Sequence, residues 1–120
     1  MPITYVIDGT SRIVVTTCVG AITFEEMRDV ATEMRDDPEF KSNFGQLIDL
    51  TQVSQLNLTF RELTTFKESF DPFSNESQRA VVALADAAYG IGRMYGGILD
   101  RPSFAVFRTM NEARQWLKLK

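Results

Sequence analysis

The chain has 120 residues, of which 44% are hydrophobic and 24% are charged, and its formal net charge is -3. This length suits one hydrophobic core, so we expect a single domain over residues 1–120. The acidic balance, without a run of Lys or Arg, argues against a nucleic-acid partner. Histidine is absent from the sequence, which excludes Ser-His-Asp and Cys-His catalysis and imidazole metal sites.

The start of the sequence has no basic segment followed by an apolar run, and no apolar stretch is long enough to cross a bilayer. We therefore expect a soluble, cytoplasmic protein with no membrane span. The one cysteine, Cys18, lies in a strand-like run and has no partner for an internal disulfide. It is expected to be a small buried side chain rather than a nucleophile.

The first predicted elements are two strands. Residues 3–7 and 13–19 are rich in β-branched side chains, and the Asp8-Gly9 pair between them is a strong hairpin signal. We therefore predict two antiparallel strands at the beginning of the sheet.

Two helices with the same start signal come next. In each, a threonine stands three residues before a glutamate, which is the capping-box pattern, and apolar residues then recur at helical spacing until an Asp-Pro pair ends the helix. A short apolar strand over residues 46–50, followed by a polar stretch, separates the two helices. The signals are Thr23, Glu26, Asp37 and Pro38 in the first helix and Thr59, Glu62, Asp71 and Pro72 in the second.

The second half of the sequence continues the alternation of strands and helices. Residues 80–85 are continuously apolar, which predicts a central parallel strand covered on both faces. Asp86 can cap a third helix that runs to about residue 99, residues 104–107 form the last strand, and Thr109 starts a final helix. The buried face of the final helix is expected to contain Ala113, Trp116 and Leu117.

The element order is β-β-α-β-α-β-α-β-α. It predicts an α/β fold with a mixed, mostly parallel five-stranded sheet and about four helices.

The third predicted helix is rich in glycine, but its glycine spacing does not match a dinucleotide-binding loop, because Tyr95 stands where a third glycine is needed. Gly92 and Gly96, one turn apart, present a flat stripe that the sheet, a second protomer or an apolar ligand could contact. Arg93, the only cation of this predicted helix, could together with the helix N-terminus at Asp86 meet an anionic headgroup. The candidate ligand or partner surface of this helix consists of Asp86, Tyr89, Arg93, Met94 and Tyr95.

The Met-Pro start suggests one enzymatic hypothesis. Removal of Met1 would leave Pro2 with an N-terminal secondary amine, which is the general base of the small tautomerases that this start resembles. In those enzymes a helix follows the first strand, whereas a second strand is predicted here, and an ordinary proline at the start of a strand is the alternative. A Pro2-based tautomerase is the third of the three functions considered.

The segment Leu47-Ile48-Asp49-Leu50-Thr51-Gln52-Val53-Ser54 resembles the strand and loop of STAS domains, the anti-sigma-factor antagonist family. Residues 86–94, 106–108 and 113–117 resemble the SpoIIAA-like branch, uncharacterised bacterial proteins related to STAS and CRAL-TRIO lipid-transfer domains. This resemblance spans nearly the whole chain and implies a STAS-like fold.

The resemblance also raises the question of a phosphorylation switch. In STAS antagonists an Asp-Ser-Ser-Gly motif opens the helix after this strand, and a partner kinase phosphorylates the second serine. The same register here reads Asn57-Leu58-Thr59-Phe60, so the resemblance makes Thr59 a candidate phosphoacceptor, whereas helix capping alone also explains a threonine there.

Together these observations predict a non-enzymatic regulatory or protein-interaction module that binds a protein partner or a second copy of itself as a homodimer. Its surface would combine the third helix with the segment around residues 49–59, including Asp49, Thr51 and Ser54. The alternative is a small binding protein for an apolar or amphipathic, lipid-like ligand held between the glycine-rich helix and the sheet, as in CRAL-TRIO relatives. No cofactor and no metal are expected.

Overall fold

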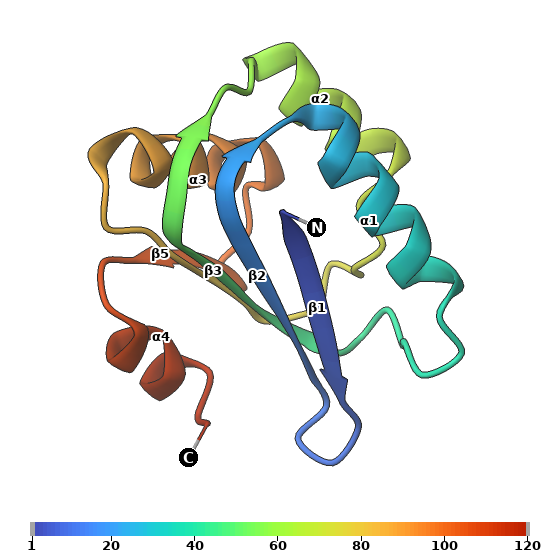
Figure 1. Ribbon diagram of the computed structural model, residues 1–120. Coiled ribbons are helices and arrows are strands. Elements are labelled where there is room, and N and C mark those ends of the chain that lie inside the picture. Colours follow the sequence, from blue (N-terminus) through green and yellow to red (C-terminus); the bar gives the residue numbers. More distant parts are fainter. Residues whose placement is uncertain (1, 120) are drawn as a thin grey trace.

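The computed structural model describes residues 2–119 and contains a five-stranded sheet in the order β1-β2-β3-β4-β5 (Figure 1). β1 is antiparallel to β2, and the remaining strands are parallel to β2. The strands are β1 (Ile3–Asp8), β2 (Ile13–Ile22), β3 (Gly45–Leu56), β4 (Arg79–Val82) and β5 (Phe104–Phe107). The helices are α1 (Phe24–Asp36), α2 (Phe60–Ser69), α3 (Asp86–Leu99) and α4 (Met110–Trp116). The predicted fold class and element order are confirmed.

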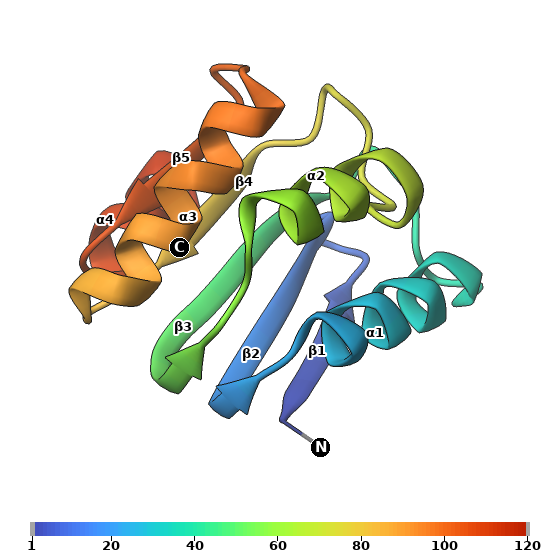
Figure 2. The same ribbon diagram turned by 90° about the horizontal axis from the view of Figure 1, so that it is seen from above.

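The helices form two layers on the sheet (Figure 2). Each parallel strand lies beside the strand that precedes it in the chain, so right-handed crossovers put α1, α2 and α3 on one face. Their apolar side chains form the larger core with one face of the strands. α4 covers part of the other face, where Ala113 is buried and Trp116 and Leu117 pack against the smaller core, as predicted.

The predicted capping signals are confirmed. The hydroxyls of Thr23 and Thr59 each accept a hydrogen bond from the backbone N–H of the glutamate three residues later, and the threonine backbone N–H donates to the glutamate carboxylate in return. Thr109 accepts the same bond from the Glu112 N–H, but there the Thr109 hydroxyl donates to the Glu112 carboxylate. Asp86 does not cap α3. The N-cap is Ala85, and the Asp86 carboxylate instead lies 3.0 Å from Arg108 in an ion pair.

β3 is longer than predicted, because the strand expected over residues 46–50 continues through the polar residues that were expected to form a loop. Asp49 is the last β3 residue that pairs with β4, and the strand then continues to Leu56 beside β2 alone. β2 also extends past residue 19 to Ile22, with register shifts around Gly20, which has a φ of 79°. The loop prediction was wrong because cross-strand backbone pairing, which a local hydrophobic pattern does not report, holds this polar arm extended.

β4 is shorter than the predicted 80–85 strand, since it ends at Val82, but all its residues are buried between β3 and β5 as expected for a central parallel strand. The next helix, α3, lies close on this part of the sheet through its glycines. A Cβ at Gly92 would lie 3.3 Å from the Val106 side chain, and one at Gly96 would lie 3.2 Å from the Phe104 ring. Of the three partners considered for the glycine stripe, the sheet is therefore the one that occupies it.

Candidate ligand-binding site

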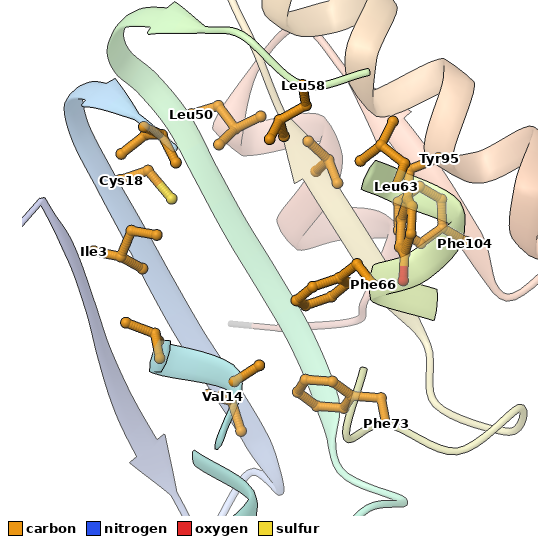
Figure 3. Close-up of a cluster of buried hydrophobic side chains, with 14 of the residues drawn as sticks. Ile3, Val14, Cys18, Leu50, Leu58, Leu63, Phe66, Phe73, Tyr95 and Phe104 are labelled. Carbon is orange, nitrogen blue, oxygen red and sulfur yellow. The ribbon is translucent and has the colours of Figure 1, made fainter. Parts of the chain in front are cut away.

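An apolar cavity of about 130 Å³ lies between the sheet and helices α1, α2 and α3. Figure 3 shows side chains of the two layers facing one another across this region, with Cys18 and Leu50 on the strands and Leu63 and Phe66 on α2. Small residues on opposite walls, Cys18, Ala31 and Gly92, contribute to the lining. Protein interiors are normally close-packed, and an empty cavity lowers the free energy of unfolding by about 24 cal/mol per Å³. A cavity of this size would therefore cost roughly 3 kcal/mol of stability if it stayed empty.

The cavity reaches partly exposed residues at the carboxyl ends of the parallel strands. Met27 of α1, Leu56 at the end of β3 and Ile91 of α3 line the cavity and are only partly buried. Open α/β sheets bind their ligands at this end of the strands. These three apolar side chains are therefore the candidate entrance.

The opposite part of the cavity is bounded by a buried polar network. Arg79 Nη1 donates a hydrogen bond to Asp71 Oδ2 at 2.7 Å, and Arg79 Nε donates to Gln46 Oε1 at 3.0 Å. Gln46 Nε2 donates to Thr16 Oγ1 at 3.0 Å, and the Tyr95 hydroxyl donates to Asp71 Oδ2 at 2.5 Å. The network therefore joins β2, β3, β4, α3 and the segment after α2.

The ion pair in this network is inaccessible to solvent, since the Arg79 and Asp71 side chains are both 4% exposed. The Arg79 guanidinium also lies 4.7 Å from the centre of the Phe73 ring. Burial, and secondly the Asp71 charge, raises the pKa of Tyr95, so its hydroxyl remains a donor. Every buried side-chain polar atom in residues 2–119 has a partner, so the network is complete without a ligand.

The sequence pattern does not predict this network, because it indicates for Asp71 only the end of the second helix. Two signals were present: Arg79 directly precedes the apolar run 80–85, and Gln46 opens the apolar run of β3. Charged or amide side chains at buried strand positions need partners. Such positions could have indicated a buried pair but not its members.

The predicted surface of α3 is divided by the structure. Tyr95 is 8% exposed and points into the core network, so it is not a surface residue. Asp86 and Tyr89 lie together at the start of the helix, where the Arg108 guanidinium is 3.9 Å from the centre of the Tyr89 ring and is ion-paired with Asp86. Arg93 is near the same ring at 6.0 Å. Met94 is 39% exposed.

The β3 residues of the predicted surface are directed to a different side of the sheet. Ile48 and Leu50 line the cavity, so Asp49 between them points to the face that α4 partly covers. The Thr51 side chain lies against that of Asp49, because the Thr51 backbone N–H and hydroxyl both donate to Asp49 Oδ1. Ser54 is exposed near the end of the same arm. Asp49 and Thr51 therefore do not share a sheet face with the outward residues of α3.

The two remaining candidate residues occupy ordinary structural positions. Thr59 is exposed at the N-terminus of α2, where its hydroxyl accepts the cap bond from Glu62 at 3.1 Å. The Pro2 carbonyl accepts a hydrogen bond from the Val19 N–H at 2.8 Å, while Met1 lies outside the described residues. Phosphorylation and proline catalysis stay predictions.

Within residues 2–119, no cluster of three or more His, Cys, Asp or Glu could hold a metal ion. In the same part of the chain, none of the helices has the length and apolar character needed to span a membrane.

No protein-family model and no curated protein sequence matches this chain. Its structure does have a solved counterpart, the crystal structure of an uncharacterised protein of the DUF3478 family from Shewanella loihica PV-4, described as having a SpoIIAA-like fold. The match has a TM-score of 0.60 at 18% sequence identity and covers 96% of this chain and 91% of the other.

The fold is SpoIIAA-like. The resemblance to SpoIIAA-like and STAS proteins seen in the sequence is thereby confirmed for the fold. At this identity the likeness concerns the fold alone, so the function must be argued from the residues of this chain.

Proposed function

We propose that this SpoIIAA-like domain is a non-enzymatic binding protein for a small apolar molecule held in the core cavity. The observation that supports this is the 130 Å³ apolar space with partly exposed Met27, Leu56 and Ile91 at one end. An engineered cavity of about 150 Å³ with similar walls binds benzene. The matching ligand size is therefore a six-membered ring or a short alkyl chain.

The chemistry of the walls favours binding without reaction. Cys18 is the one thiol in the lining, and burial, with a smaller effect of Asp49, raises its pKa to about 12. A thiol in this state is a poor nucleophile. Because the Arg79 network is internally paired, an uncharged ligand fits this cavity better than a carboxylate, which would have to displace Asp71.

The test is to fill the cavity without disturbing its polar end. Ala31 lines the cavity and is buried, so Ala31→Met should occupy the space with a flexible apolar side chain. Benzene should raise the melting temperature of the wild type in calorimetry and should leave that of the variant unchanged. Ala87→Met, at an exposed position of α3, is the matched control and should respond as the wild type does.

Absence of a benzene effect on the wild type, or an equal effect on Ala31→Met, would overturn the proposal. Native mass spectrometry of gently purified protein gives an independent result, because a co-purifying ligand adds mass that is lost on denaturation.

A regulatory or protein-interaction module is the second candidate function, and the outward cluster on α3 favours it. Leu84 is 60% exposed and its carbonyl accepts a hydrogen bond from Arg108 at 2.9 Å. The Arg108 and Arg93 guanidinium groups also lie over the Tyr89 ring. Aromatic and arginine side chains are enriched at interfaces. Tyr89→Ser and Arg93→Ser should then weaken association, with a protein partner or as a homodimer, in sedimentation experiments while the melting temperature stays unchanged. If both variants associate as strongly as the wild type, this surface is excluded as the interface.

A further inference from the structure

The edge strand β1 has free backbone hydrogen-bonding groups. Because Val19 donates to the Pro2 carbonyl, these two residues form a hydrogen-bonded pair, and such pairs alternate along an antiparallel ladder. The backbone groups of every second β1 residue therefore point to β2, and those of the residues between point away from the sheet. The outward set is Ile3, Tyr5 and Ile7.

This free edge borders a groove. A space of about 340 Å³ lies between β1 and α1, with Ile3, Thr4 and Tyr5 on the strand side and Val30, Glu33 and Asp37 on the helix side. The Tyr5 hydroxyl donates to Asp37 Oδ2 at 3.0 Å and links the two sides. An open strand edge beside a helix is the arrangement to which an extended peptide can add as another strand.

Within residues 2–119 no further strand pairs with this edge, and Tyr5 and Ile7 are partly exposed there, whereas Ile3 is only 5% exposed. Proteins usually protect edge strands with lysine, proline, a bulge or a covering segment. The β1 sequence Ile-Thr-Tyr-Val-Ile-Asp contains neither lysine nor proline and carries its only charge at its last residue, Asp8. The pairing with β2 is regular along all of β1.

The charges around the groove indicate which peptide fits. Glu33 of α1 and its C-cap Asp37 are the carboxylates in the lining. Glu26 and Asp29 share the helix side of Glu33 by their spacing, although Asp29 is ion-paired with Arg28 at 3.1 Å. No Lys or Arg lines the groove. Two copies paired through β1 would bring both sets of carboxylates to one interface, which opposes self-pairing, whereas a basic segment would be attracted.

We propose that this groove binds an extended, Lys- or Arg-containing segment of a partner protein, which pairs with Tyr5 and Ile7 as an additional strand. Side chains on one side of the added strand would contact α1 and its carboxylates. The groove shares Ile3 and Val30 with the lining of the core cavity, and no residue of α3 lines it.

The probe is a labelled, acetylated and amidated heptapeptide of alternating lysine and valine, titrated at low ionic strength and followed by fluorescence anisotropy. It should bind in saturable fashion, and the matched glutamate–valine peptide should not. Glu33→Lys should weaken binding at least threefold more than Glu68→Lys, which makes the same charge change at an exposed position of α2. Equal weakening by both variants would mean attraction to net charge alone and would overturn the proposal.

Backbone pairing is tested by amide hydrogen exchange measured by NMR. Without peptide, the amides of Tyr5 and Ile7 should exchange faster than those of Thr4 and Val6, and peptide binding should slow the first set. N-methylation of either all the valine or all the lysine amides of the peptide should abolish binding, and methylation of the other set should not. Absent binding, protection elsewhere, or slow exchange of the first set in a peptide-free dimer would each overturn the proposal.

Discussion

Arg79 and Asp71 stabilise the fold only as a pair. Both charges have lost their water, and each is compensated by the other and by neutral partners, Gln46 for the arginine and Tyr95 for the carboxylate. Removing one member of such a pair leaves an uncompensated buried charge, which costs about 3–5 kcal/mol, whereas replacing both with apolar residues is often close to neutral.

We therefore expect Asp71→Ala to lower the free energy of unfolding by about 3 kcal/mol or more. The double variant Asp71→Leu with Arg79→Met should recover part of this loss, since it leaves no unpaired charge in the core but removes the partners of Gln46 and Tyr95. Urea unfolding followed by circular dichroism measures both values. A loss below about 1 kcal/mol for the single variant would mean that water reaches the pair.

A second residue-scale prediction concerns alkaline pH. The pKa of Cys18 is raised from 9.0 to about 12 in the folded protein, so above pH 9 the unfolded chain binds fewer protons and stability falls as pH rises. The slope for one such group approaches about 1.4 kcal/mol per pH unit. Between pH 8 and pH 10, wild type should lose about 1 kcal/mol more than Cys18→Ala.

The same unfolding experiment at the two pH values gives this difference. Tyr95, whose pKa is also raised from 10.0, would add its own loss only above pH 10, in both proteins alike. An identical pH dependence for wild type and Cys18→Ala would contradict the buried, protonated thiol.

At the scale of elements, α3 combines two kinds of glycine. Gly92 and Gly96 face the sheet and would force neighbours apart if they carried a side chain, while Gly90 and Gly97 have no atom within 4 Å of a Cβ position. A glycine in a helix interior is about 1 kcal/mol less favourable than alanine. The first pair is needed for close packing and the second pair is not.

Gly90→Ala should therefore stabilise the protein by about 0.5–1 kcal/mol through helix propensity alone. Gly96→Ala should gain less or should destabilise, because its Cβ would press on the Phe104 ring that packs against Tyr95. Thermal unfolding of the two variants gives the comparison. Equal stabilisation by both variants would show that the Phe104 ring can move aside without a cost in stability.

The starts of α1 and α2 could be predicted from the sequence because a capping box consists of residues three apart in the chain. The buried network could not, because Thr16, Gln46, Asp71 and Arg79 meet only when four separate segments assemble. The cavity was likewise unpredictable in size, because it depends on how side chains such as Ala31 fail to fill a space between layers. The surface role of Tyr95 was inferred from helix composition, which does not tell which side of α3 faces the sheet.

At the scale of the whole molecule, the two faces of the sheet have separate apolar cores that share the same strands. Leu47 belongs to the core under α4, and its neighbour Ile48 lines the cavity on the other face. Trp116 is the one tryptophan of the sequence and lies in the α4 core, where its ring is 5.7 Å from Phe107.

Because the shared strands couple the two cores, we expect cooperative unfolding of both. Tryptophan fluorescence, which reports the α4 core, and far-ultraviolet circular dichroism, which is dominated by the other helices, should give coincident urea transitions. An earlier fluorescence transition would mean that α4 separates from a sheet that stays folded.

The order of the strands in the sheet is the order of the strands in the chain. A chain leaving the ribosome therefore completes the β1–β2 hairpin first, and every later strand finds its neighbour already synthesised. No strand has to wait for a later one or be inserted between two that are paired. The sheet can thus gain one strand after another at its β5 side during translation. The Arg79 network forms later, because it needs Tyr95 and therefore can be completed only after α3 has emerged.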